Sequence, residues 1–223
     1  MTDLTSECTG SRHLRRTAML GLSAGLLAMA CCGCAMIKAS AYFLQPTSET
    51  MNAEFKGLEG KQVLIYVWTG PEIAWDYPKL RLDLSAYLGD YLHKKVPKAR
   101  MVDPLQVERF LEQRNTLEQD PAELGRHFKA DVVLHLSVYE FSMRDPEMAH
   151  FYRGRLAASI QVYDLAKPEE PQRTLLQDAK VVVPEDAPIG IENTTADKVR
   201  QMTYDAFTVQ VGKKFHQWER PIE

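Results

Sequence analysis

The chain has 223 residues, of which 45% are hydrophobic and 26% are charged, with 27 lysines and arginines against 30 aspartates and glutamates. That length suits one domain, and the apolar fraction is large enough for a hydrophobic core. The composition excludes a mainly disordered chain, a collagen and a multispan membrane protein. The net charge of −3 gives no indication of the positively charged surface that nucleic-acid binding requires, so we expect no nucleic-acid partner.

All four cysteines lie within the first 34 residues, which indicates a targeting segment and not a disulfide framework. Arg12, Arg15 and Arg16 make a basic region, and apolar residues 17–30 follow it. That apolar stretch is short for a membrane span of ~20 residues. We therefore predict a signal peptide over residues 1–33, and an uncleaved anchor helix is the alternative.

The run from Ala30 to Ala35 resembles a bacterial lipobox, in which cleavage occurs before a cysteine that then carries lipid. Cys34, which follows Gly33, is the predicted lipidation site, and Cys31 is the second choice. Acyl chains such as palmitate would then attach the protein to a membrane, because an acidic chain is not attracted to anionic headgroups. A mature chain without other cysteines excludes thiol catalysis and thiolate metal sites.

Residues 34–60 are predicted to be a lipidated tether with a helical turn near residues 51–55. Residues 61–218 are predicted to form a single domain, and residues 219–223 a tail. In that domain the apolar run 63–68 predicts a strand covered on both faces, and residues 69–78 a loop. Apolar residues spaced three or four apart predict a helix from residue 79 to residue 95, followed by a short strand at residues 99–102.

The second half of the domain has two helix starts and then three strands. Asp103-Pro104 and Asp120-Pro121 each combine an N-cap with a proline at the first helical position. Alternating residues predict strands at 131–143, 150–164 and 173–183, which form an antiparallel meander, and a closing helix covers 195–218. The predicted fold class is α/β, of α+β-like organisation, in the order β-α-β-α-α-β-β-β-α. We expect one mixed sheet with its amphipathic helices packed on one face.

The lipobox, the tether and this order of elements resemble a group of bacterial envelope lipoproteins. A further shared feature is a helix followed by Ala130-Asp131 and an apolar strand. The group includes activator lipoproteins of penicillin-binding proteins, the periplasmic domain of the curli secretion channel, the amino-terminal domain of TolB and auxiliary lipoproteins of ABC transporters. The resemblance covers residues 60–218, and it implies partner binding or assembly in the envelope rather than chemistry.

Motifs for catalysis are not found in the predicted mature chain. A Gly-x-Ser-x-Gly match at residues 21–25 lies inside the signal peptide, where no nucleophile elbow can form. No two mature histidines have the spacing that places two metal ligands on one helical face. We therefore expect no catalytic residue, no metal site and no cofactor.

Two regions are candidates for partner binding. His135, Tyr139, Arg153 and Arg155 are expected, with Gln161 and Tyr163, to line one open face of the sheet. A half-exposed face without a binding role is the alternative. Trp75 and Tyr77 in the predicted 69–78 loop are the second region, and their alternative role is to anchor the loop on the core.

The sequence thus predicts a membrane-anchored, periplasm-facing envelope lipoprotein that acts as a non-catalytic accessory subunit in envelope assembly, transport or cell-wall synthesis. Its partner is expected to be a protein of the envelope, and the sequence does not specify an oligomeric state. An envelope enzyme with a site built from scattered residues and a carrier of small ligands or lipids are the alternatives.

Overall fold

The computed structural model describes residues 48–114, 119–145, 147–167 and 171–221. The predicted signal peptide and the candidate lipidation sites Cys31 and Cys34 lie outside these residues. Among the helices of the described part, none has the length and apolar character needed to cross a membrane. Residues Thr50–Glu219 form one compact unit, and the sites below lie within it.

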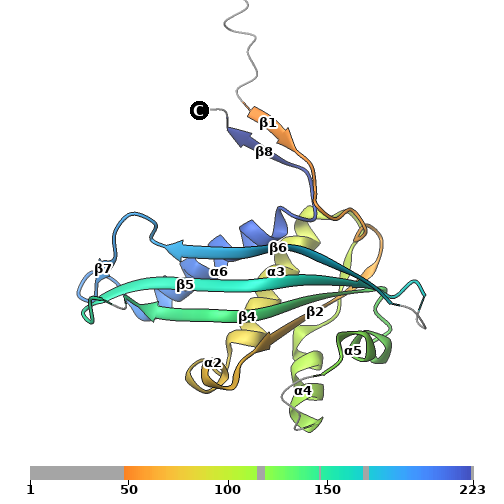
Figure 1. Ribbon diagram of the computed structural model, residues 1–223, viewed down its shortest axis with the longest axis horizontal. Helices are drawn as coiled ribbons and strands as arrows, with labels where there is room; N and C mark the ends of the chain where they lie inside the picture. Colours follow the sequence, from red (N-terminus) through yellow and green to blue (C-terminus); the bar gives the residue numbers. More distant parts are fainter. Residues whose placement is uncertain (1–47, 115–118, 146, 168–170, 222–223) are drawn as a thin grey trace, which may run out of the picture. The chain divides into compact units, whose positions relative to one another are not determined.

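A mixed sheet is the centre of this unit (Figure 1). In the described chain its strand order is β3 (Arg100–Met101), β2 (Gln62–Thr69), β4 (Val132–Arg144), β5 (Phe151–Asp164) and β6 (Gln172–Val183), and β7 (Ile189–Gly190) pairs with β5. β2 runs parallel to β3 and β4, whereas β4, β5 and β6 are antiparallel. The predicted mixed sheet with a three-stranded meander is confirmed.

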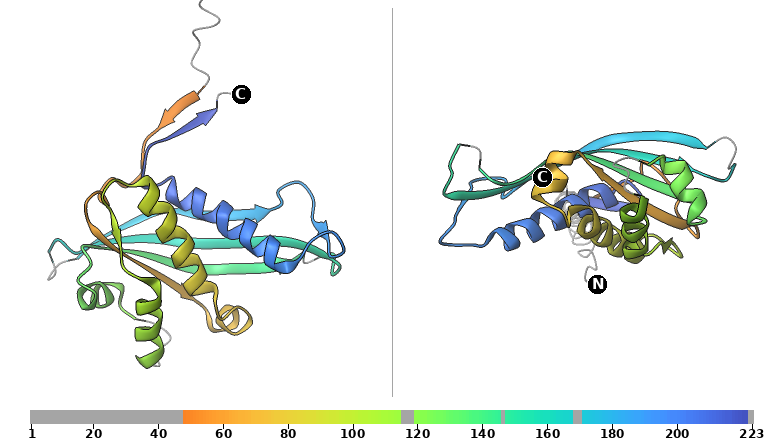
Figure 2. Two further views of the ribbon diagram at one scale, coloured as in Figure 1. Left: turned by 180° about the vertical axis from the view of Figure 1, so that it is seen from behind. Right: turned by 90° about the horizontal axis from the view of Figure 1, so that it is seen from below.

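Helices α3 (Leu80–Lys95) and α6 (Ala196–Gly212) lie together across one face of the sheet (Figure 2). The leucines of α3 and residues such as Phe207 of α6 are fully buried against strand residues such as Leu134 and Ile160. This packing follows from the helical spacing of the apolar residues, because residues three or four apart face the same side. We call this side of the sheet the inner face.

The other two main helices pack on the opposite side. α4 (Pro104–Arg114) and α5 (Pro121–His127) form a second apolar cluster with Leu64, Tyr66 and Val133. The expectation that all helices pack on one face was therefore wrong. The cause is the continuous apolar sequence of β2, because successive side chains point to opposite faces and both faces must be covered.

Helix starts follow the predicted chemistry, whereas several boundaries differ. Asp120 accepts a hydrogen bond from the backbone N–H of Ala122, 3.1 Å away, and Pro121 opens α5. The closing helix ends at Gly212, not at residue 218, and β8 (Trp218–Pro221) pairs with β1 (Ser48–Met51).

Two predictions for connecting segments were wrong. Residues 69–78 contain a short helix, α2 (Pro71–Asp76), because a proline in the first turn is compatible with helix geometry. Residues 51–55 contain no helical turn, and Met51 ends β1. The segment assigned to the tether also contributes to the domain, since Leu58 is buried in the core and Phe55 packs edge-on against Phe215.

Candidate functional site

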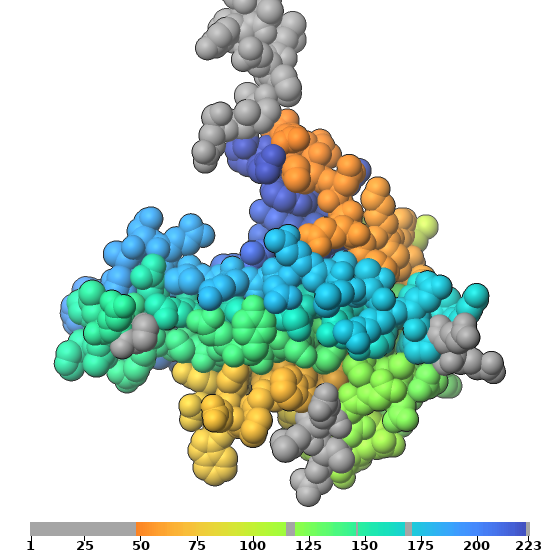
Figure 3. Space-filling model, in the orientation of Figure 1, coloured from red at the N-terminus to blue at the C-terminus, as the bar shows by residue number. Residues whose placement is uncertain are grey.

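The sheet has a face that α3 and α6 do not cover, and we call its β4, β5 and β6 portion the outer face. The strand register places His135 opposite Gln161, Tyr163 opposite Arg173, and Arg155 opposite Ser142. Their chain neighbours, including Leu134 and Val162, point to the inner core. Figure 3 views this side, where the three strands form an open surface. The structure therefore brings the predicted sheet-face residues to one face.

Tyr139 projects from an irregularity in β4. The register shifts between Val138 and Glu140, which is the position of a β-bulge. The Tyr139 side chain is 56% exposed, and its hydroxyl donates a hydrogen bond to Asp178 over 3.3 Å. Glu140 forms an ion pair with Lys180 at 3.0 Å. The outer face thus presents an exposed aromatic ring between strands that are linked by polar contacts.

His135 is held within the sheet and is not a free side chain. Its ring stacks on Tyr66 at a centroid distance of 5.0 Å, and its Nε2 lies 3.4 Å from the Ser137 hydroxyl. Its Nδ1 is buried and has no hydrogen-bond partner in the described chain. Burial, with a smaller effect of the Arg173 charge, lowers the pKa of His135 to about 4. The ring is therefore neutral at pH 7 and contributes packing rather than charge.

Arginines make the outer face basic although the chain is acidic overall. Arg153 donates from Nη2 to the Glu185 carbonyl over 2.6 Å, which holds its side chain at the sheet surface. Arg155 and Arg173 lie on the same face by register. None of these arginines forms an ion pair with a residue of the described ranges, whereas Lys180 is paired with Glu140. Leu175, opposite Gln161, adds an apolar side chain that is 63% exposed.

The two candidates from the 69–78 segment, Trp75 and Tyr77, have different environments in the structure. Trp75, on α2, is 87% exposed. Tyr77 follows α2 and packs edge-on against Phe141 with ring centroids 4.6 Å apart. Tyr77 therefore anchors the segment on the core, and a partner-binding role remains a prediction for Trp75 in particular.

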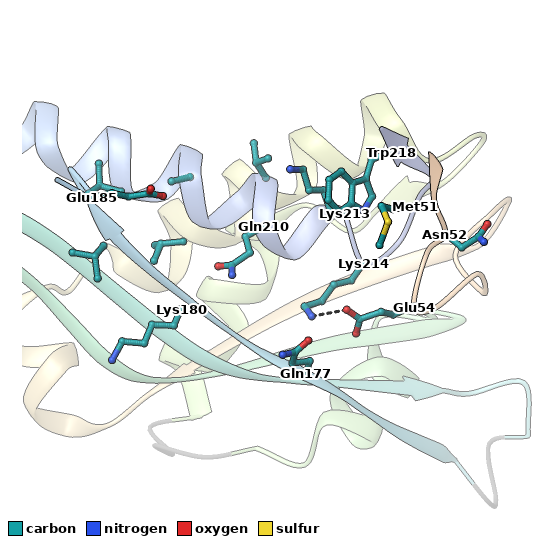
Figure 4. A pocket seen from close by; sticks show the side chains of 15 residues that line it. Met51, Asn52, Glu54, Gln177, Lys180, Glu185, Gln210, Lys213, Lys214 and Trp218 are labelled. Atoms are coloured by element: carbon teal, nitrogen blue, oxygen red, sulfur yellow. Dashed lines mark hydrogen bonds and ion pairs between the residues drawn. The ribbon is translucent and has the colours of Figure 1, made fainter. Parts of the chain in front are cut away.

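A groove between β6 and α6 was missed by the sequence reasoning (Figure 4). It has a volume of about 550 Å³, with Val181, Val182 and Val183 along the strand and Val209 and Gln210 from the helix. At one end Lys214, only 7% exposed, pairs with Glu54 at 2.8 Å, as the dashed line shows. The Lys213 ammonium lies 4.1 Å from the centre of the Trp218 ring. Because the groove joins segments far apart in the chain, no local pattern could have indicated it.

Side chains that could together bind a metal ion are not gathered in the described residues. Within these ranges, no group of three or more histidine, cysteine, aspartate or glutamate side chains could hold a metal ion. The candidate site that the geometry supports is a surface for binding, namely the outer face, which is continuous at Lys180 with the β6–α6 groove.

No family model matches this chain, and no curated protein matches it. Among solved structures it is similar to lipoprotein GNA1162 from Neisseria meningitidis, at 14% identity and a TM-score of 0.42, over 68% of this chain and 98% of that one. A PelC dodecamer from Paraburkholderia phytofirmans matches at 10% identity and a TM-score of 0.43, over 77% and 99%. The LpoB C-terminal domain from Salmonella enterica matches at 14% identity and a TM-score of 0.27, over 57% of this chain and 85% of that one.

These similar structures include bacterial lipoproteins. The identities and TM-scores are low, and the likenesses assign neither a partner nor an activity to this chain.

Proposed function

We propose that this protein is a non-catalytic accessory lipoprotein of the bacterial cell envelope, anchored through Cys34 and facing the periplasm, whose outer face binds an acidic surface of a protein partner. The observation that supports this most directly is the composition of the outer face. Arg153 and Arg155 lie on β5 towards the end of this face where Arg155 pairs with Ser142 and Val182, whereas Arg173 and the exposed Leu175 lie on β6 towards its other end. The exposed Tyr139 lies on β4 between these ends, and α3 and α6 leave all three strands open on this side.

The chemistry of these side chains favours a protein partner with carboxylates. Arginine and tyrosine are enriched among the residues that dominate binding energy in protein interfaces. A guanidinium pairs with a carboxylate through two parallel hydrogen bonds, and its attraction over longer range accelerates association. A basic face on a chain of net charge −3 therefore selects for acidic partners.

A carrier of lipids or small ligands has less support from the geometry. Such a carrier needs an apolar cavity, and the natural place would be between the sheet and the helices α3 and α6. That space is filled in the described chain, because Leu84, Leu88 and Phe207 have no exposed surface. The β6–α6 groove is open to the surface and is lined by several lysines and glutamates.

Site-specific cross-linking tests the outer face. A photoreactive amino acid is placed at position 139 of the full chain in its native envelope, and the adduct is identified by mass spectrometry. We expect an adduct with an acidic segment of a protein, which Arg153→Glu with Arg155→Glu abolishes. Lys56→Glu with Lys95→Glu is the matched control, because both lysines are exposed and neither belongs to β4, β5 or β6.

The captured partner is then purified and its binding to the full chain is measured. We expect the affinity to fall at least about tenfold when the salt concentration rises from 50 to 300 mM, since exposed charges are screened. Capture that survives the arginine reversal, or binding that does not depend on salt, would contradict the proposed function.

The anchor is tested by metabolic labelling with radioactive palmitate. We expect the wild type and Cys31→Ala to be labelled and Cys34→Ala to be unlabelled. Loss of label only in Cys31→Ala would show that Cys31, and not Cys34, carries the lipid. An unlabelled wild type would refute the lipoprotein assignment.

A further inference from the structure

A second groove runs between α3 and α6, on the side of the sheet opposite to the outer face. Its volume is about 620 Å³. Its lining residues are Ala86, Tyr87, Asp90, Tyr91 and Lys94 of α3, with Asp205, Thr208 and Val209 of α6. We call it the helix groove.

The aromatic rings of the helix groove are held in place by their neighbours. Tyr87 contacts Tyr204 edge-on at a centroid distance of 5.5 Å. The Tyr91 hydroxyl lies 3.1 Å from Nε2 of His216. Gly212 allows Tyr91 to lie against α6, because a Cβ atom at that position would overlap the tyrosine ring. The rings therefore form a preorganised wall, which lowers the entropy cost of binding.

The polar groups of the helix groove have unused capacity for hydrogen bonds. The Thr208 side chain is only 4% exposed, and its hydroxyl has no hydrogen-bond partner in the described chain. A buried hydroxyl without a partner costs stability, so a ligand that supplies one is favoured. Asp205 forms no ion pair with a described residue, and Asp90 has only an exposed contact of 3.6 Å with Lys94. Exposed pairs of this kind contribute little.

Two carboxylates, an unsatisfied hydroxyl and two tyrosine rings are the chemistry that binds a guanidinium. A carboxylate accepts its N–H groups, and an aromatic ring attracts its delocalised charge. Val209, which is 37% exposed, adds an apolar contact. The outer face carries arginines that form no ion pair within the described ranges, and one of them, Arg173, lies two residues from the exposed apolar side chain of Leu175.

We infer that the partner of the outer face is a second copy of this chain, which presents its helix groove to the arginines. This inference rests on the proposed function of the outer face. The two surfaces lie on opposite sides of one sheet, so they cannot meet within one copy. Each copy then binds one neighbour through its outer face and another through its helix groove, which is a head-to-tail arrangement.

The test uses the full lipidated chain, purified in density-matched detergent and studied by sedimentation equilibrium. The outer-face variant carries Arg153→Glu with Arg155→Glu, and the groove variant carries Asp90→Lys with Asp205→Lys. We expect the wild type and the Lys56→Glu, Lys95→Glu control to associate. Each variant alone should associate at least about tenfold more weakly, because like charges then face each other.

Mixing the two variants separates a head-to-tail contact from a symmetric one. The groove variant keeps an intact outer face, and the outer-face variant keeps an intact groove. An equimolar mixture should therefore regain association in which the two variants alternate, because the original contact forms on one side of each copy and the charge-exchanged contact on the other. The chain that combines all four substitutions should regain association, because both charges are exchanged. Unfolding curves by circular dichroism establish that each variant is folded.

The outcomes also separate this inference from the proposed function. A monomeric wild type whose outer face cross-links to a different acidic protein overturns the inference and leaves the proposed function intact. Self-association that neither variant weakens, or a mixture of the two variants that does not associate, also overturns it. Absence of any adduct at position 139, together with a monomeric wild type, overturns both.

Discussion

The inner and outer faces of the same sheet differ in what covers them. On the inner face, apolar residues of β4 and β5 such as Leu136 and Ile160 are completely buried beneath α3 and α6. On the opposite side, the buried apolar cluster lies near β2 and the start of β4, where α4 and α5 cover Leu64 and Val133. The rest of that side carries arginines, Tyr139 and Leu175.

The contrast separates folding from recognition. Successive side chains of a strand point to opposite faces of the sheet, so one strand contributes both to the core and to a binding surface. The inner face contributes hydrophobic free energy through burial, whereas the open portion of the outer face contributes little and is free to vary in chemistry. Substitutions on the two faces should therefore differ in kind.

The largest expected effect is on the inner face. Phe207→Ala removes a fully buried ring from α6 and leaves a cavity, so we expect a loss of about 4 kcal/mol in the free energy of unfolding. Urea denaturation followed by circular dichroism measures it. Met202→Ala on the same helix is the control, since Met202 is 37% exposed. A similar loss in both variants would refute the placement of the core.

A substitution in the second apolar cluster, beneath α4 and α5, should lower the free energy of unfolding by a smaller amount. Leu111→Ala on α4 removes a side chain that is 6% exposed, and we expect a loss of about 3 kcal/mol. Leu105→Ala, at a position of 49% exposure on the same helix, should change stability by less than about 0.5 kcal/mol. Equal effects in the two variants would mean that α4 does not cover this part of the sheet.

His135 links stability to pH. Its pKa is about 4 in the folded chain against 6.5 when unperturbed, so below pH 6.5 the unfolded chain binds a proton that the folded chain does not. The stability present above pH 6.5 is therefore lost as the pH falls towards 4. Between pH 7.5 and 4.5 the wild type should lose about 2.5 kcal/mol more than His135→Asn.

Urea denaturation at the two pH values measures this difference. His150→Asn serves as the control, because His150 is exposed and should behave like the wild type. If the wild type and His135→Asn lose stability in parallel, the ring is hydrated in the folded chain and the burial of its Nδ1 is wrong.

The smallest effect is expected at the open part of the outer face. Tyr139→Phe removes only the hydroxyl that donates to Asp178, and the change in stability should stay below about 0.5 kcal/mol. The exposed ring remains available for cross-linking and binding. Thermal unfolding measures the change, and a loss above 1 kcal/mol would show that this residue supports the fold.

Local sequence patterns determined most of this protein's architecture. The helical spacing from Leu80 to Leu92, the Asp-Pro starts of α4 and α5, and the alternation of β4 and β5 each reflect an interaction between residues close in the chain. The same alternation predicted that His135, Gln161 and Tyr163 share a face, which the strand register confirms.

Tertiary structure alone decided the features that depend on residues far apart in the chain. β1 pairs with β8 although the two strands lie at opposite ends of the described sequence. The helices pack on both faces of the sheet, and residues of α3 and α6 together line the helix groove. A short-range pattern determines which side of an element is apolar, because it follows from backbone geometry. It does not determine which distant element covers that side, because that choice depends on how all the elements pack together.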